Sequence, residues 1–347
     1  MAGGRTRRAR QGAAVSTAPW ISAQLRQLLS QRGHAWLLHG PSGLGQYTLA
    51  LGLAQAWLCD RPTPDGACGE CDSCHQVEVR SHIDLAVLMP EVQMQELGWP
   101  LDEKAQSDLD DKKRKPSKEI RVDAMRAALE FAQRTSGRGR GKVMLVYPAE
   151  RMNQVTANAL LKTLEEPPGD VRFVLATEAA HQLLPTIRSR CQGHTLAWPA
   201  AEQAEAWLKE EGVPAAAAPV LLRAAGGRPE DALRLHRAGL DAQAWARWPK
   251  ALARGDGSAL ADWGPAQAVE SLQKLCHDLI AMRNGAEPRF FAPGDLPPAA
   301  DPAALTGWWR DLAATSRTVE HPFNAGLMLE DLVSRARAAL NSEPHSR

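Results

Sequence analysis

The stretch LLHGPSGLGQYTLALGLAQA, residues 37 to 56, decides the fold. A short apolar segment runs into a glycine-rich turn, and a helical pattern follows the turn. Gly40 and Gly45 fit the spacing of a phosphate-binding loop, whose template is Gly-x-x-x-x-Gly-Lys-Ser/Thr. Gln46 replaces the lysine of the template, and Tyr47 replaces its hydroxyl residue. The turn is therefore kept, while the two side chains that hold phosphate and metal are lost.

Short apolar segments alternate with helical periodicity from about residue 19 to residue 199. This alternation predicts a mostly parallel sheet covered by helices on both faces. The predicted strands are 35–39, 85–89, 143–147, 173–177 and 194–197, and the predicted helices are 21–31, 46–58, 120–134 and 153–165. Residues 90–119 form a polar insert of mixed charge with flanking prolines, and we expect most of it to be a surface loop.

After Pro199 the predicted strands stop, and two shifts in composition separate the α/β domain, residues 19–199, from two helical pieces. Residues 200–240 are predicted to form short helices, and residues 241–340 are helical again around a proline-rich interruption. Residues 1–18 are basic and contain no apolar core, which excludes a secretory signal. We expect a disordered basic N-terminus there, with an organelle transit peptide as the alternative.

The composition is that of an ordinary globular protein. The 347 residues are 44% hydrophobic and 23% charged, with a net charge of +1. This balance argues against a strong autonomous DNA binder, which would have a basic footprint. No apolar stretch approaches the ~20 residues that a membrane span needs, so no membrane partner is expected. The cysteine pattern does not fit a disulfide scaffold, so a reducing cytoplasm is the simplest compartment to expect for this chain.

Four of the six cysteines lie close together in the sequence: Cys59, Cys68, Cys71 and Cys74. Four thiolates can surround zinc tetrahedrally and fill every coordination position, so the spacing predicts one structural zinc in a module at 59–74. His75 and His82 are alternative ligands, although we interpret each as a surface histidine. No helix rich in arginine and lysine follows the cysteines, which disfavours a zinc finger that reads DNA.

A second element of a nucleotide site is also degenerate. The acidic pair that binds the metal in an NTPase should end the predicted strand at 143–147, but Tyr147 and Pro148 stand there. Glu150 is displaced from that position. Because the loop and the acidic motif have both lost their functional groups, we predict that this chain does not hydrolyse nucleotide.

Two further motifs are ANALLKTLEEPPGDVRFVLAT, residues 157–177, and LLPTIRSRCQ, residues 183–192. With these motifs the sequence resembles the clamp-loader subunits of bacterial replicases, an AAA+ family, over nearly the whole chain. The resemblance implies an AAA+ α/β domain with an inserted zinc knuckle at 19–199, a small helical lid at 200–240 and an all-helical collar at 241–340. Motor subunits of this family, tau and gamma, keep the lysine and the acidic pair. The present combination resembles the delta-prime type, which keeps the fold and the Ser-Arg-Cys motif and dispenses with ATP.

The resemblance implies a non-catalytic subunit of the DNA polymerase III holoenzyme, in the bacterial cytoplasm. Its expected neighbours are the delta subunit and a tau/gamma ATPase, and the complex would load the sliding β clamp onto primed DNA. The degenerate loop, which includes Gly43, would bind no ATP productively. Arg190 of the Ser-Arg-Cys motif would be an arginine finger supplied in trans to the neighbouring ATPase, with Arg188 as the alternative.

Two other functions are weighed against this one. The first is a weakly active DNA-dependent ATPase subunit of the clamp loader, and the missing lysine and acidic pair argue against it. The second is a free-standing zinc-containing DNA-binding module, against which the net charge of +1 argues.

Overall fold

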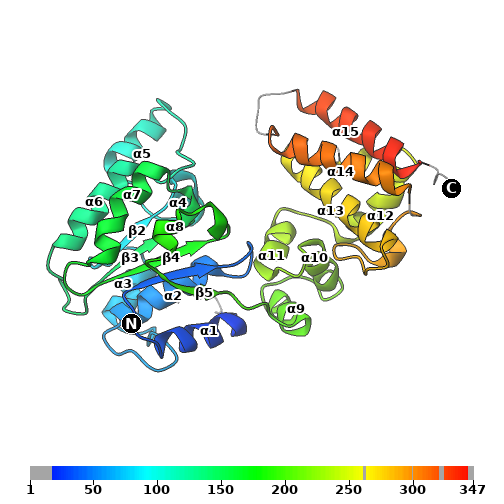
Figure 1. The fold of residues 1–347 in the computed structure, drawn as a ribbon. Helices are drawn as coiled ribbons and strands as arrows, with labels where there is room; N and C mark the ends of the chain where they lie inside the picture. The colour runs from blue at the N-terminus through cyan, green and yellow to red at the C-terminus, as the bar shows by residue number, and fades with distance from the viewer. Residues whose placement is uncertain (1–17, 261–262, 299, 320–323, 343–347) are drawn as a thin grey trace, which may run out of the picture. The chain divides into compact units, whose positions relative to one another are not determined.

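The computed structural model describes residues 18–260, 263–298, 300–319 and 324–342. The chain divides into two compact units, Met1–Ala197 and Trp198–Arg347 (Figure 1). Of the predicted basic N-terminus, residues 1–17 lie outside the described residues.

The first unit is built on a parallel five-stranded sheet with the order β2-β3-β4-β1-β5. The strands are β1 Ala35–His39, β2 Leu85–Leu88, β3 Lys142–Val146, β4 Val171–Thr177 and β5 Gln192–Thr195. Their positions confirm the five predicted strands, with ends that shift by up to two residues. All five residues of β3 are buried, as expected for an inner strand covered on both faces.

Helices cover both faces of this sheet. The first unit contains α1 Pro19–Leu29, α2 Gln46–Leu58, α3 Asp72–Glu78, α6 Val122–Gln133, α7 Gln154–Glu165, α8 Pro185–Arg188 and the short turns η1 Ala149–Arg151 and η2 Ala180–Gln182. Helices α1 and α2 pack together, and α2 contacts β3 and β4. Helices α6 and α7 pack together against a separate core that includes Met144, Phe173 and Leu175.

The polar insert differs from the predicted surface loop, because it contains two short helices, α4 Glu91–Glu96 and α5 Glu103–Asp110. The carboxylate of Glu91 is buried and explains much of this order. It pairs with Arg114 and accepts the backbone N–H of Ser117 at 2.8 Å, which folds the end of the insert back onto α4. Composition alone indicated a solvated charge run, and the long-range ion pair is what orders it.

Among its described residues, the second unit contains helices joined by turns and no strand. It contains α9 Ala201–Glu210, α10 Ala218–Ala224, α11 Pro229–Arg237, α12 Ala242–Ala253, α13 Pro265–Arg283, α14 Pro302–Ser316, α15 Ala325–Leu340 and the turns η3 Ser258–Leu260 and η4 Pro293–Asp295. An aromatic cluster forms its core, where Trp245 stacks on Phe291 with ring centroids 4.8 Å apart. Ala224 of α10 belongs to the same core. The division of this unit into a lid at 200–240 and a collar at 241–340 stays a prediction.

The buried carboxylate of Asp278 closes the proline-rich interruption of the second unit. Its two oxygens accept the backbone N–H groups of Arg289, Phe290 and Phe291 at 2.7 to 2.9 Å.

Among the described residues, no helix is both long and apolar enough to cross a membrane.

Candidate functional site

The glycine loop lies at the carboxyl edge of the sheet, between β1 and α2. Gly43 and Gly45 have φ angles of 74° and 98°, in the left-handed region that favours glycine. Gly45 is also the N-cap of α2. The backbone therefore forms the strand-to-helix turn that the sequence predicts, and the difference from a working phosphate loop lies in its side chains.

Gln46 turns back onto this loop. Its side chain is buried, and the amide Nε2 donates to the carbonyl oxygens of Gly40 at 2.8 Å and of Pro41 at 2.6 Å. Both donor hydrogens of the amide are thus used within the loop. In a working site a lysine at this position extends toward the β- and γ-phosphates. Here the corresponding side chain holds the loop together instead.

Two tyrosines and a tryptophan gather beside the loop. The ring of Tyr47 packs against that of Tyr147, with centroids 5.4 Å apart, and the indole Nε1 of Trp99 donates to the Tyr47 hydroxyl at 2.7 Å. The hydroxyl of Tyr147 donates to Glu178 at 3.2 Å. Burial raises the pKa of Tyr47, so its hydroxyl is neutral at physiological pH. Sequence reasoning missed Trp99, whose signal is a lone tryptophan inside a polar insert.

The displaced acid, Glu150, has both carboxylate oxygens occupied. One oxygen accepts from the Thr177 hydroxyl at 2.6 Å, and the other accepts the backbone N–H of Glu178 at 3.1 Å. Glu150 therefore fastens the end of β4 to the turn after β3. Both Glu150 oxygens are therefore engaged within the fold, and the assignment of Tyr147 and Pro148 to the positions of the acidic pair stays a prediction.

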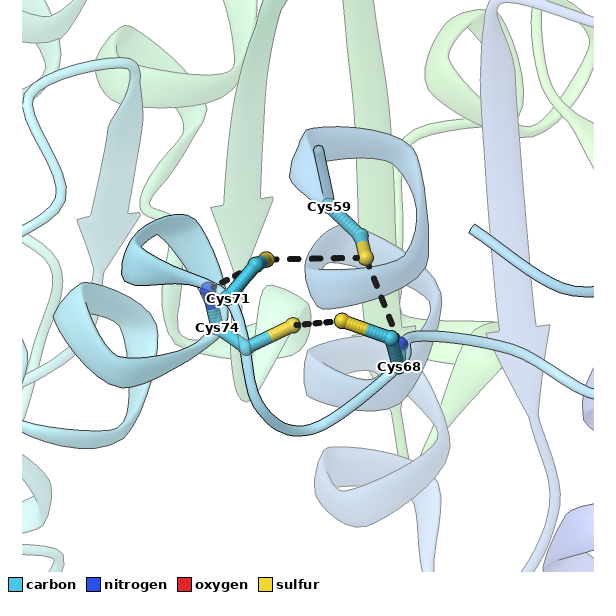
Figure 2. A group of neighbouring side chains, drawn as sticks. All are labelled: Cys59, Cys68, Cys71 and Cys74. Carbon is cyan, nitrogen blue, oxygen red and sulfur yellow. Dashed lines mark hydrogen bonds between the residues drawn. The ribbon is translucent and has the colours of Figure 1, made fainter. Parts of the chain in front are cut away.

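The four clustered cysteines converge on one point at the other end of α2 (Figure 2). The sulfur atoms all lie within 4.8 Å of one another. Two of the separations are 3.8 Å, between Cys59 and Cys71, and 3.9 Å, between Cys68 and Cys74. A tetrahedral site with zinc–sulfur bonds of ~2.3 Å has sulfur–sulfur edges of about 3.8 Å. The donor set therefore fits a single zinc ion with four thiolate ligands.

Backbone N–H groups support the thiolates. Cys59 Sγ accepts from the N–H groups of Arg61 at 3.4 Å and of Cys68 at 3.3 Å. The backbone N–H of Glu70 is the main cause that lowers the pKa of Cys68 to about 6, whereas burial raises the pKa values of Cys59 and Cys74. Ionised thiols are the form that binds metal. Gly66 and Gly69 have positive φ angles where the chain turns around the sulfurs.

The alternative histidine ligands are not part of the cluster, which consists of four cysteines among the residues that the structure describes. His75 is exposed, as predicted. His82 is buried, so its interpretation as a surface histidine is wrong. Its Nδ1 accepts the backbone N–H of Asp84 at 3.1 Å, which places this ring at the start of β2 rather than in solvent.

Arg190 follows α8 and precedes β5, an edge strand of the sheet. Its guanidinium donates to Glu165 and to the carbonyl oxygen of Thr186, and about a third of the side chain is exposed. In a parallel sheet the residues before β5 lie at the amino ends of the strands, and the loop after β1 lies at their carboxyl ends. The register pairs Trp36 with Gln192, so roughly 15–20 Å of strand separates Arg190 from its own glycine loop. Arg188, the alternative finger, is exposed at the end of α8.

The comparisons with known proteins agree with one another. A family model described as "DNA polymerase III, delta subunit" matches residues 20–199, slightly more than half of the chain. The delta' subunit of DNA polymerase III from Pseudomonas aeruginosa is 37% identical over 267 residues, which cover 76% of this chain and 68% of the relative. The delta' subunit from Escherichia coli is 34% identical over 198 residues, covering 56% of this chain and 52% of that protein.

Another subunit of DNA polymerase III is also similar. The tau subunit of DNA polymerase III from Salmonella typhimurium is 33% identical over 208 residues, which cover 58% of this chain and 28% of that subunit. The matched segments thus span about two thirds of the Pseudomonas relative, about half of the Escherichia one and about a quarter of tau. By the family match and the similarity over most of its length, the chain belongs to the delta' family of DNA polymerase III subunits.

Proposed function

We propose that this chain is a non-catalytic clamp-loader subunit that completes the ATP site of a neighbouring subunit with Arg190. The observation that carries the proposal is the contrast between two edges of the sheet, the one at the carboxyl ends of its strands and the one at their amino ends. At one edge Gln46 and the aromatic cluster fill the chain's own nucleotide loop. At the other edge a guanidinium is held near the surface, a strand length away from that loop.

The chain's own loop is a poor ATP site for three separate reasons. Gln46 carries no charge toward phosphate, and its amide is used by Gly40 and Pro41. Tyr47 offers a bulky ring where a hydroxyl should bind Mg²⁺. Glu150 is engaged with Thr177 and Glu178. These features support a chain that does not hydrolyse ATP in isolation, and they disfavour the weakly active DNA-dependent ATPase.

Arg190 suits action in trans on a phosphoryl group. A guanidinium is always charged and can bridge two oxygens, so it stabilises the charge that develops on the transferring phosphoryl group. Such an arginine contributes roughly 10³ to 10⁵ in rate at a single site. The similarity to tau supports a tau/gamma ATPase as the neighbour, because the two chains share a related segment of 208 residues.

The remaining assignments complete this function. The delta subunit would be the other neighbour, and the helices at 241–340 would form the collar that holds the ring. The complex would place the sliding β clamp on primed DNA in the bacterial cytoplasm. The four cysteines would hold one structural zinc, and the chain would bind no ATP productively.

The test is Arg190→Ala in a complex reconstituted with delta, tau/gamma, the β clamp and primed DNA. Assembly and zinc content should be unchanged, while clamp loading and ATP turnover at the adjoining site should fall, the latter by about 10³-fold. Arg188→Ala is the matched variant, two residues earlier and also exposed, and it should keep clamp loading. Unchanged clamp loading with Arg190→Ala would refute the role, and a loss confined to Arg188→Ala would move the finger to that residue.

A further inference from the structure

We propose that Glu165 is a positioning residue, which aims the Arg190 guanidinium at the neighbouring nucleotide. This inference rests on the proposed function of Arg190 and adds the residue that makes the arginine effective. Within this chain, hydrogen bonds already restrain the guanidinium of Arg190.

One carboxylate oxygen of Glu165 binds one side of the guanidinium. Arg190 Nε and Nη2 donate to Glu165 Oε2 at 3.2 and 3.0 Å, and Nη1 donates to the carbonyl oxygen of Thr186 at 3.1 Å. These bonds use three of the five N–H groups of an arginine and involve all three nitrogens. One N–H on each terminal nitrogen is left over, and such a pair can bridge two phosphate oxygens. The side chain is thus restrained without losing its two-donor fork.

The position of Glu165 is unfavourable for the helix that carries it. Glu165 is the last residue of α7, where the negative end of the helix dipole disfavours a carboxylate. Its side chain is 60% exposed, so it contributes little to the core. Arg190 is the cation paired with it among the described residues. A carboxylate that opposes the dipole and contacts one arginine is better explained by what it does to that arginine than by the stability of α7.

Surface ion pairs of this exposure add little to folding, so the loss of Glu165 should act on the aim of Arg190. A reacting or stabilising group displaced by ~1 Å can cost on the order of 10²-fold in rate. Without Glu165 the arginine still reaches the right rotamer for part of the time. We therefore expect Glu165→Ala to lower kcat for ATP at the adjoining site by about 5- to 20-fold, with KM for ATP unchanged.

Two further variants show whether the carboxylate acts as a hydrogen-bond acceptor. Glu165→Gln keeps an acceptor oxygen and should recover most of the lost kcat. Glu166→Ala removes the next residue in the chain, an exposed glutamate at the C-cap of α7, and should behave as wild type. The thermal midpoint of the complex should be the same for all of these variants.

A double-mutant cycle in the reconstituted complex decides the mechanism. If Glu165 acts through Arg190, then Glu165→Ala should have no further effect once Arg190→Ala is present. A loss with Arg190→Ala but none with Glu165→Ala would overturn this inference and leave the proposed function standing, as would failure of Glu165→Gln to rescue. A full additional loss in the Arg190→Ala background would also overturn it, because Glu165 would then act directly. No loss with Arg190→Ala would overturn the proposed function itself.

Discussion

The two ends of α2 differ in the kind of motif that they carry: a glycine turn precedes its first residue, and a cluster of four cysteines lies at its C-cap. At its first residue, Gln46, the glycine turn follows the backbone path that the spacing predicts, and the side chains of Gln46 and Tyr47 bond within the fold. At its C-cap, Cys59, four cysteine sulfur atoms that could hold one metal ion converge. The turn at the N-terminal end is required to join β1 to α2 whatever the chain binds. Four thiols within 4.8 Å serve no such purpose in the fold.

A glycine motif and a set of metal donors therefore differ in what they say about a site. A glycine pattern describes a path of the backbone, and side chains of the fold itself can occupy the space beside that path. Gln46, Tyr47 and Trp99 do so here. A set of metal donors predicts a coordination site, and if one of the four cysteines were lost the other three could no longer complete that site. The side chains, rather than the glycines, therefore indicate which end is functional.

The largest effect is expected at the cysteine end. Structural zinc contributes about 10–16 kcal/mol of apparent binding free energy in zinc-finger peptides. Cys71→Ser should therefore reduce the zinc content from about one ion per chain to almost none. Residues 59–74 should loosen while the sheet stays folded, because the cysteine cluster is separate from the core under α6 and α7. Elemental analysis, thiol titration and circular dichroism measure these three outcomes.

Cys191→Ser is the control for that experiment, since Cys191 lies outside the cluster and should leave the zinc in place. Freshly purified wild-type protein without zinc and with four freely titratable clustered thiols would contradict the assignment. In that case the two ends of α2 would be alike, each a relic of a lost site.

A smaller effect is expected at the loop end. Gln46→Lys should produce no ATP hydrolysis in the isolated chain, because Tyr47, Tyr147 and Pro148 still leave Mg²⁺ without ligands. The variant should also lower the free energy of unfolding by about 1–3 kcal/mol, since it removes the amide that satisfies two buried carbonyl oxygens and buries a charge. An ATPase assay with Mg²⁺ and primed DNA, together with urea unfolding, tests both statements.

Gln46→Ala separates the two causes, because it removes the amide without adding charge. Mg-ATP turnover by the single lysine variant would show that the acidic motif has been misassigned, and that the loop end of α2 is closer to a working site than its contacts suggest.

The smallest effect concerns Trp99, a residue of the polar insert that donates a hydrogen bond to Tyr47 beside the glycine loop. Trp99→Phe keeps an aromatic ring and removes the donor to Tyr47, at a cost of about 0.5–1.5 kcal/mol in unfolding free energy. Burial raises the pKa of Tyr47, and the Trp99 hydrogen bond opposes that rise. Loss of the bond should therefore raise this pKa further, so that the tyrosinate forms at higher pH.

The chain has two tyrosines, Tyr47 and Tyr147, so an ultraviolet titration repeated in Tyr147→Phe isolates the signal of Tyr47. Trp309→Phe, on the exposed side of α14, is the matched control and should leave the titration unchanged. An unaltered Tyr47 titration in Trp99→Phe would mean that the insert does not help to close the loop in solution.

Much of the fold could be predicted because its signals are local. The strand at 35–39 and the helix at 46–58 follow from periodicity and a glycine turn within one stretch, and the structure has the same bounds. The metal donors lie within sixteen residues, so their spacing alone indicated that they meet. The helices of the insert were not predicted, because they depend on the burial of Glu91 against Arg114, 23 residues away.

The parallel α/β domain, the helices that follow it and the clustering of the four cysteines could all be predicted from the sequence alone. The contacts of Trp99 with Tyr47, 52 residues apart, and of Glu165 with Arg190, 25 residues apart, come from the tertiary fold and could not be predicted. The reason is physical. Periodicity and spacing are read along the chain, whereas these contacts depend on which strands are neighbours and on which edge of the sheet each connection lies.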